Sequence, residues 1–474
     1  MKKITLPLLF VFYIGFSQSL VPFYPTDQAS GSDFGSKVDV FDNEILVSSS
    51  TELLSNPASI GKVYLFNKVD NELEQTNSFY PNDALSSDEF GASLSIRDGF
   101  IAIGSPFHDA NLENSGAVYL YHKVGGSYQL MQKITAADTR ENDNFGSFVK
   151  IYNNQLFISA AGDEPDLQDI NTNNGSVYVY SLIGNVWTFS EKITHDNSLH
   201  FGQKVEAENN TIVIAWDYPN GPEASQYILY TYAWDNSHWA YENSHYYLYT
   251  QQGNNDFSLS NNELFVLITD PNSPNKIIFY SKVGNEWVGI SEYDMGPDNI
   301  LTKIKVNNNT MFLGSTQYTL QTERNFPVRI FKRNGNYWNQ QLTIHGTGPT
   351  GLDDYFGSAI ASQGNSVIIG APKEGPLVLS GKAYYLDMAT LNADVFEKKS
   401  SQVYPNPTQN VVHIETDNSS AINSVNVYTV TGNLIYSNNL NTTEVSLENV
   451  AQGIYFMKVK FENNTEETFK IIRN

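Results

Sequence analysis

Residues 89–121 contain the stretch that decides the fold: Glu89-Phe90-Gly91, then Asp98-Gly99 with Phe100-Ile101-Ala102-Ile103-Gly104, then Gly116-Ala117-Val118-Tyr119-Leu120-Tyr121. Asp98-Gly99 suits a two-residue hairpin turn, because Asp and Gly tolerate positive φ. The continuous apolar run after this turn is typical of a strand buried on both faces. The third segment alternates aromatic residues and predicts a further strand. The stretch therefore predicts one antiparallel β unit.

This unit recurs along most of the chain. Phe34, Phe90, Phe145 and Phe201 stand 56, 55 and 56 residues apart, and Phe356-Gly357 is a further copy. Two weaker units are recovered by their Asn-Asn turns and later Trp residues, with Gly253 and Ile300 in the place of Phe. We call these places the anchors: positions 34, 90, 145, 201, 253, 300 and 356. Four antiparallel strands repeated seven times predict an all-β, seven-bladed β-propeller.

The seventh unit lacks its fourth strand, since Ala393 stands where a large residue opens that strand in the other units. The missing strand is found at the other end of the chain. Phe23-Tyr24-Pro25-Thr26-Asp27 mirrors Phe79-Tyr80-Pro81-Asn82-Asp83, and each segment lies eleven residues ahead of its Phe-Gly. The N-terminal segment should therefore supply the outer strand of the last blade and close the ring.

Phe356-Gly357 followed by Gly370-Ala371-Pro372, with Phe90-Gly91 and Gly104-Ser105-Pro106, resembles the FG-GAP repeat of integrin-α propellers and their bacterial relatives. The resemblance covers residues 18 to 388. Calcium-binding members of that family carry a long Asp-rich loop where this chain has two-residue turns. We therefore expect no cofactor and at most weak calcium binding.

The chain starts with Met1-Lys2-Lys3 and an apolar run from Ile4 to Phe16, which predicts a secretory signal peptide over residues 1–17. No second long apolar run exists, so we expect no transmembrane anchor. The absence of cysteine excludes disulfides and thiolate zinc sites. Lys and Arg number 28 against 51 Asp and Glu, a net charge of −23, which excludes nucleic acid and anionic membranes as expected partners.

The composition changes after the predicted propeller (residues 18–390). Residues 391–402 form a polar linker, and residues 403–474 alternate polar and apolar positions as a small β-sandwich does. This tail resembles the type A C-terminal sorting domain of the type IX secretion system of Bacteroidota. The matching residues are Tyr404, Pro405, Asn406, Pro407, Gly453, Tyr455 and Lys470. The resemblance implies that the type IX machinery is a partner and that the protein is secreted or held on the outer face of the outer membrane.

Long loops are expected on one face of the propeller, which we call the long-loop face, and short turns on the other, the short-turn face. The expected loops are Ser105–Ser115, Ala161–Asn174, Trp216–Ser225, Thr269–Asn275 and Pro372–Ser380. Binding usually resides in such loops. The ligand-binding candidates are Trp216, Asp217, Tyr218, Asp109 and Asp270. Trp216 is interpreted either as a sugar-stacking platform or as a residue that fills space beside degenerate blades.

Carboxylates gather on the long-loop face, and Asp163, Asp166 and Asp169 are the candidate metal ligands. The alternative is a solvated acidic loop.

The sequence holds no Gly-x-Ser-x-Gly elbow, no helical pair of metal-binding histidines and no phosphate-binding glycine loop. We therefore expect a binding protein rather than an enzyme: an adhesin, or a propeller that binds an extracellular glycan or protein. One alternative is a secreted polysaccharide hydrolase or lyase that uses carboxylates in the central channel. Another is a structural surface component.

Overall fold

The computed structural model describes residues 20–27, 32–50, 61–69, 72–83, 85, 87–163, 174–195, 200–218, 225–249, 255–270, 273–284, 286–295, 301–315, 327–335, 337–347, 355–374, 380–389, 401–416, 421–430, 432–438, 442–461 and 466–474. The predicted signal peptide lies outside these residues. The chain divides into two compact units, Met1–Thr390 and Leu391–Asn474. The finer domain boundaries stay predictions. Among the described residues, none belongs to a helix with the length and apolar character that a membrane crossing requires.

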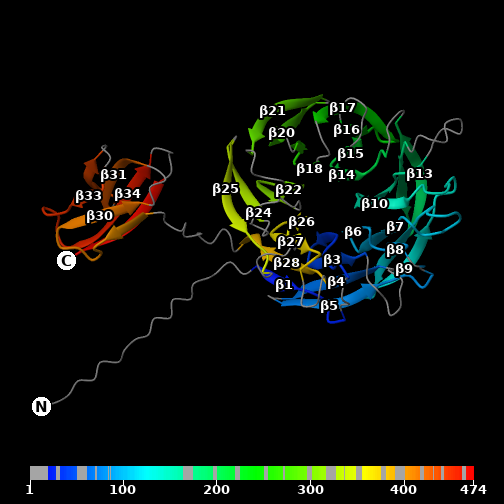
Figure 1. Cartoon of the computed structure of the whole chain (residues 1–474), viewed down its shortest axis with the longest axis horizontal. Coiled ribbons are helices and arrows are strands. Elements are labelled where there is room, and N and C mark those ends of the chain that lie inside the picture. Colours follow the sequence, from blue (N-terminus) through cyan, green and yellow to red (C-terminus); the bar gives the residue numbers. More distant parts are fainter. Residues whose placement is uncertain are drawn as a thin grey trace, which may run out of the picture. The chain divides into compact units, whose positions relative to one another are not determined.

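Seven four-stranded antiparallel sheets form the ring of the first unit (Figure 1). Blades 1 to 3 contain β2 (Val38–Phe41), β3 (Glu44–Ser49), β4 (Lys62–Val69) and β5 (Glu72–Phe79); β6 (Ser93–Arg97), β7 (Phe100–Ser105), β8 (Ala117–Val124) and β9 (Ser127–Ile134); β10 (Phe145–Tyr152), β11 (Gln155–Ala160), β12 (Ser176–Ile183) and β13 (Val186–Thr194). Blades 4 to 6 contain β14 (Lys204–Glu208), β15 (Thr211–Tyr218), β16 (Ser225–Trp234) and β17 (Trp239–Tyr249); β18 (Asp256–Ser260), β19 (Glu263–Asp270), β20 (Ser273–Val283) and β21 (Glu286–Asp294); β22 (Lys303–Asn307), β23 (Thr310–Gly314), β24 (Val328–Asn334) and β25 (Tyr337–Ile344).

Blade 7 confirms the predicted closure of the ring. It contains β26 (Ala359–Gln363), β27 (Ser366–Ala371), β28 (Lys382–Asp387) and, as its outer strand, β1 (Val21–Phe23). Val21 pairs with Tyr385 and Phe23 with Ala383 in antiparallel register. Strands from both ends of the propeller therefore share one sheet, and β1 pairs with β28, which would otherwise be the open edge of blade 7.

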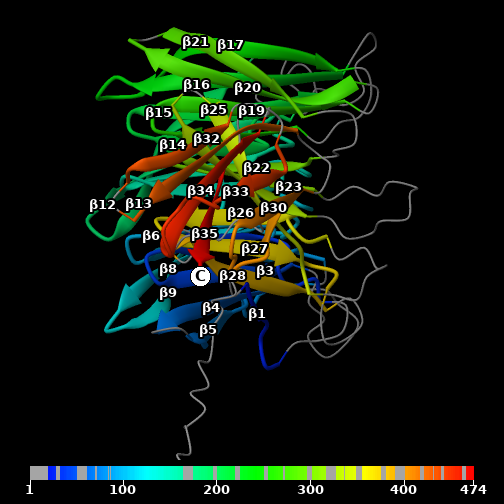
Figure 2. The ribbon, with the colours of Figure 1, turned by 90° about the vertical axis from the view of Figure 1, so that its left-hand side faces the viewer.

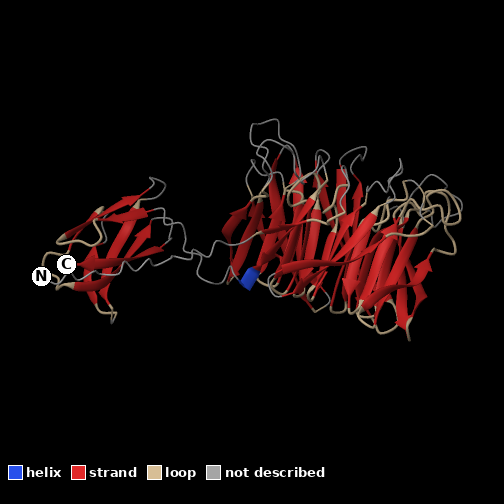
Figure 3. Cartoon of the chain, turned by 90° about the horizontal axis from the view of Figure 1, so that it is seen from below, coloured by secondary structure: helices blue, strands red, loops and turns tan. Residues whose placement is uncertain are grey.

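The predicted two-residue turns are confirmed in all seven blades, between β2 and β3 and at the equivalent place in every other unit. Asn153 and Asn154 have φ values of 47° and 59°, and Asn261 and Asn262 have 55° and 59°. A type I′ hairpin turn requires positive φ at both central residues, and Asn tolerates it. The side view in Figure 2 shows the strands running across the propeller, and Figure 3 shows the short turns along one of its faces.

The Phe-Gly pair fixes the contact between one blade and the next. Phe34, Phe90, Phe145, Phe201 and Phe356 are completely buried. The carbonyl of the glycine in this pair lies close to a small residue near the end of the second strand of the preceding blade. A Cβ at Gly104 would lie 2.0 Å from the Gly146 oxygen, and one at Gly370 would lie 2.0 Å from the Gly35 oxygen. A side chain at Gly104 or Gly370 would therefore force these blades apart. The equivalent residue of blade 1 is Ser48, whose hydroxyl donates to the Gly91 carbonyl (2.6 Å).

The second unit is a β-sandwich, as predicted. One sheet has the order β29 (Ser401–Tyr404), β30 (Val411–Thr416) and β33 (Glu444–Ser446). The other has the order β32 (Leu434–Asn438), β31 (Ile422–Thr429), β34 (Gly453–Phe461) and β35 (Glu466–Arg473). Its core cluster draws Val412 and Val445 from the first sheet, and Met457 and Ile471 from the second.

Candidate functional site

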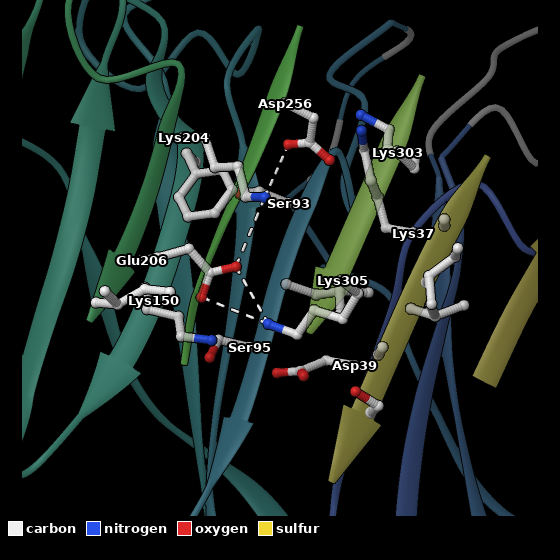
Figure 4. Close-up of a pocket in the computed structure, with 18 of the residues that line it drawn as sticks. Lys37, Asp39, Ser93, Ser95, Lys150, Lys204, Glu206, Asp256, Lys303 and Lys305 are labelled. Atoms are coloured by element: carbon white, nitrogen blue, oxygen red, sulfur yellow. Dashed lines mark hydrogen bonds and ion pairs between the residues drawn. The ribbon is translucent and has the colours of Figure 1, made fainter. Parts of the chain in front are cut away.

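The described residues enclose a central channel with a volume of about 570 Å³. It is lined by the first strand of every blade: β2, β6, β10, β14, β18, β22 and β26. Figure 4 shows charged side chains from several of these strands projecting into it. The volume lies within the range of small-molecule sites in proteins.

The channel wall follows the two-residue period of a strand. Residues three positions after each anchor form an upper level at the end of the channel nearest the long-loop face: Lys37, Ser93, Phe148, Lys204, Asp256, Lys303 and Ala359. Residues five positions after the anchors form a second level, which contains Asp39, Ser95, Lys150, Glu206, Lys305 and Ala361. Equivalent positions of the repeat therefore meet around one axis.

Several polar side chains of these levels have a structural task. Each first strand is the inner edge of its sheet, so part of its backbone has no partner strand. The Ile96 N–H donates to Asp39 Oδ2 (2.9 Å), and the Ile304 N–H donates to Asp256 Oδ2 (3.0 Å). The Ile151 N–H donates to Ser95 Oγ (3.1 Å). The side chains of one blade thus satisfy the backbone of the next.

Ion pairs occupy the side of the channel formed by blades 4 to 6. Lys204 Nζ lies 2.8 Å from Asp256 Oδ1 and 3.6 Å from Glu206 Oε1. Lys305 Nζ lies 3.2 Å from Glu206 Oε1. Burial by itself raises the pKa of the Glu206 carboxyl, but the charges of Lys305, Lys150 and Lys204 outweigh it and lower that pKa to about 2.

A second polar system ties the blades together at the long-loop face. Asp83 follows β5 and accepts from the Tyr119 hydroxyl of the next blade (2.9 Å), and Lys133 Nζ lies 2.5 Å from it. Asp138 follows β9 and accepts in the same way from Tyr178 (2.9 Å). Acidic residues of this face are therefore partly used in contacts between blades.

The candidate metal ligands are only partly described. Asp163 is 2% exposed. Its Oδ2 accepts a hydrogen bond from the Ser176 hydroxyl and lies 2.7 Å from Lys192 Nζ. Asp166 and Asp169 lie outside the described residues. Among those that are described, no group of three or more His, Asp or Glu side chains has the arrangement of a metal site. The metal site stays a prediction, and its first member already has a cationic partner.

The prediction of a sugar platform at Trp216 is wrong for this residue, because its side chain is only 6% exposed. It packs into the core cluster of blades 3 and 4 with Phe201 and Ile228, which supports the space-filling interpretation. The expected loop Trp216–Ser225 is also shorter than predicted, since β15 continues to Tyr218 and includes Asp217. The segment Thr269–Asn275 belongs largely to β19 and β20, and Asp270 pairs with Ser273.

Asp109 is exposed on the long loop between β7 and β8, where its Oδ1 accepts the Asn114 N–H (2.8 Å). It remains a candidate for ligand contact, and the structure does not bring it together with Trp216. The channel residues Lys37, Lys204 and Lys303 were not predicted from the sequence. The signal that would have found them is their shared position, three residues after an anchor, in strands that propeller geometry places around one axis.

The predicted sorting motif is built into the sandwich. The Asn406 side chain joins the motif to the last strand: its Nδ2 donates to the Lys470 carbonyl (2.6 Å) and its Oδ1 accepts the Ile472 N–H (2.9 Å). The Tyr455 hydroxyl donates to the Ala451 carbonyl (2.7 Å), while Lys470 is exposed. The motif residues therefore hold the two ends of this unit together.

Comparison with protein families matches residues 73–121 and 128–180 to the FG-GAP repeat. Residues 402–474 match the secretion system C-terminal sorting domain. The chain carries FG-GAP repeats and a C-terminal sorting domain. The sorting domain marks export by the type IX system to the cell surface or the extracellular space. Contact with that secretion machinery follows from it.

Solved structures similar to the FG-GAP propeller have low sequence identity. The β-propeller domain of the Trilobed protease from Pyrococcus furiosus has 8% identity and a TM-score of 0.43, over 74% of this chain and 94% of that one. The periplasmic gluconolactonase PpgL from Pseudomonas aeruginosa has 10% identity and a TM-score of 0.44, over 65% and 84% of the two chains. We draw no functional conclusion from either. A comparison with curated proteins finds no match.

Proposed function

We propose that this protein is an extracellular binding protein, an adhesin or a propeller that binds a glycan or protein, delivered by the type IX system. The observation that carries the proposal is the polar channel of about 570 Å³, whose upper level lies at the long-loop face of a closed ring. A closed ring of seven sheets is a rigid support, and loops on rigid supports are common binding surfaces. The sorting domain is consistent with a ligand outside the cell.

Two buried carboxylates of the channel, Glu206 and Asp256, do not fit the hydrolase alternative. A glycosidase needs one carboxylic acid whose pKa is raised, so that it carries a proton to the leaving group. Burial raises the pKa of Glu206, but the surrounding lysines outweigh it and lower that pKa to about 2. Asp256 is likewise buried, and Lys204 and Lys303 lower its pKa. Both groups are ionised at neutral pH and have no proton to give.

Asp143 is a carboxyl with the opposite shift, because burial raises its pKa to about 6. It is 1% exposed, accepts the Arg140 N–H (2.5 Å) and does not line the channel. A buried group in this position does not reach a polysaccharide. Glu89 also has a raised pKa, because of its burial and the charge of Asp33, but the charge of Lys37 opposes that shift. We keep binding as the proposed activity, and the degradation screen tests the hydrolase alternative.

The proposal is tested by presenting the purified full-length protein to a glycan array and, in parallel, to a screen for polysaccharide degradation. Retention without release of products supports a binding protein. Release of reducing ends, or of unsaturated ends, identifies a hydrolase or lyase instead. If neither assay responds, the structural surface component becomes the better explanation.

A further inference from the structure

The upper level of the channel is cationic in a strongly acidic protein. Its charged members are Lys37, Lys204, Lys303 and Asp256, a net of +2, whereas the whole chain carries −23. The other three positions of the level are Ser93, Phe148 and Ala359. Only 28 Lys and Arg are present in 474 residues, so three of them at one repeat position is a local concentration of positive charge.

The carboxylates nearby do not neutralise this charge. Asp256 forms an ion pair with Lys204 through Oδ1 and accepts the Ile304 N–H through Oδ2. The side-chain ammonium groups of Lys37 and Lys303 make no hydrogen bond or ion pair with the part of the chain that the structure describes, although the Lys37 carbonyl accepts the Ser48 N–H (2.9 Å). Both side chains are accessible from the channel, Lys37 being exposed and Lys303 half-buried. Two ammonium groups thus remain without a bonded counterion.

These two ammonium groups lie close to each other although they come from different blades. Lys37 precedes β2 and Lys303 begins β22, and Figure 4 shows both nitrogens at the same end of the channel near Asp256. Lys37 is accessible to water in the channel but is surrounded by the ring, and this desolvation lowers its pKa; the charge of Lys303 lowers the pKa further, while Asp33, Glu89 and Asp256 raise it. Repulsion between like charges therefore acts in the ligand-free protein.

We propose that Lys37 and Lys303 together bind one oxyanion, a carboxylate, sulfate or phosphate group of a small acidic ligand, at the long-loop end of the channel. This inference deepens the proposed function by naming a ligand class, and it rests on that function for its biological meaning. An oxyanion offers several acceptor oxygens to two ammonium donors, and its charge removes their repulsion. The walls of the channel reduce screening by water, which strengthens the attraction.

The test uses the full-length protein and three probes at constant ionic strength: sodium sulfate, sodium glucuronate, and glucose as the neutral match for glucuronate. Binding is measured by calorimetric titration and by thermal unfolding. The variants are the double change Lys37→Met with Lys303→Met, and Lys150→Met as the matched control. Lys150 lies in the second level of the same channel, and its side chain is also without a hydrogen bond or ion pair to the described residues.

We expect sulfate and glucuronate to bind the wild type and glucose not to bind. The double variant should lose affinity for both anions by about tenfold or more, while Lys150→Met retains it. Tighter binding of glucuronate than of sulfate assigns the site to a sugar acid, and equal binding assigns it to a free inorganic anion. Thermal unfolding without any anion verifies that the double variant is folded.

The proposal is overturned if sulfate and glucuronate both fail to bind the folded wild type, or if the double variant binds them unchanged. Equal losses in Lys150→Met would also overturn it, because the anion would then lie deeper in the channel. Since these probes are simple anions, failure here leaves the glycan-array result unaffected. A negative glycan array likewise leaves the anion titration valid.

Discussion

At the scale of single residues, the inner strands of this propeller combine two tasks. Asp39, Ser95 and Asp256 accept backbone N–H groups of the next blade and so satisfy an inner sheet edge that has no partner strand. The lysines of the same strands supply positive charge to the channel. A polar channel is therefore partly a consequence of ring closure, and only the lysines without a bonded partner point to a ligand.

Glu206 should contribute strongly to stability at neutral pH. Burial raises its pKa, but Lys305, Lys150 and Lys204 lower it from the ordinary value of 4.5 to about 2. A carboxyl whose pKa is depressed in the folded state stabilises the protein above its unfolded pKa. That contribution is lost as the pH falls toward 2. Glu206→Gln should therefore lower the free energy of unfolding at pH 7 by about 3 kcal/mol, and the difference from wild type should shrink between pH 4.5 and 2.

Urea unfolding at pH 7, 4.5, 3 and 2 measures this difference. Glu208→Gln is the matched control, because Glu208 lies two residues further along β14, is half-buried and accepts the Asn262 N–H (3.2 Å). Its effect should be smaller and less dependent on pH. A constant difference between Glu206→Gln and wild type across this range would contradict the assignment of the ion pairs.

Some residue environments could be predicted from the sequence and others could not. Phe and Gly at the anchors were predictable because the same contact between blades is repeated, so the sequence repeats with it. Trp216 was not, because its burial depends on the space between blades 3 and 4 and not on its own strand. The lysines of the upper level could have been predicted from the sequence by comparing equivalent positions of the repeat units. Whether Lys37 and Lys303 approach each other depends on how many blades lie between them.

At the scale of elements, β1 is the shortest strand of the propeller and closes it. Phe23 is buried against Phe34 and Phe66, with ring centroids 6.2 and 4.9 Å away, so one side chain joins the closing strand to the core of blade 1. This strand was predictable because its sequence copies the end of blade 1. The lengths of β15 and β19 were not, since strand extension into a loop depends on pairing with β16 and β20.

Phe23→Ala should lower the free energy of unfolding of the propeller by about 3 kcal/mol, because it removes a buried aromatic ring and loosens the closure. Tyr24→Ala is the control, since Tyr24 is the next residue and is 46% exposed. Denaturant unfolding of both variants measures the difference. Equal stability of the two variants would show that β1 does not hold the ring closed.

At the scale of the whole molecule, the propeller and the sorting domain are separate compact units, and the sorting domain has a core of its own. Ending the chain after Gln402 should therefore leave the propeller folded and hold it in the periplasm. Cell fractionation, with limited proteolysis to verify folding, measures this outcome. Truncated protein in the medium at the level of the full chain would contradict export by the sorting domain.

The propeller is proposed to bind its ligand through the long-loop face. The chain has no cysteine, so a single cysteine can be introduced and coupled to a large polyethylene glycol maleimide. Asn111 is exposed on the loop between β7 and β8, and Ser127 is exposed at the turn between β8 and β9 on the short-turn face of the same blade. Neither position lies in the core.

The decisive measurement is retention of the two coupled variants, Asn111→Cys and Ser127→Cys, on a ligand identified by the glycan array. Polymer at Asn111→Cys should abolish retention, while polymer at Ser127→Cys should leave it close to that of the uncoupled protein. Loss of retention only in Ser127→Cys, or unchanged retention in both, would contradict binding through the long-loop face.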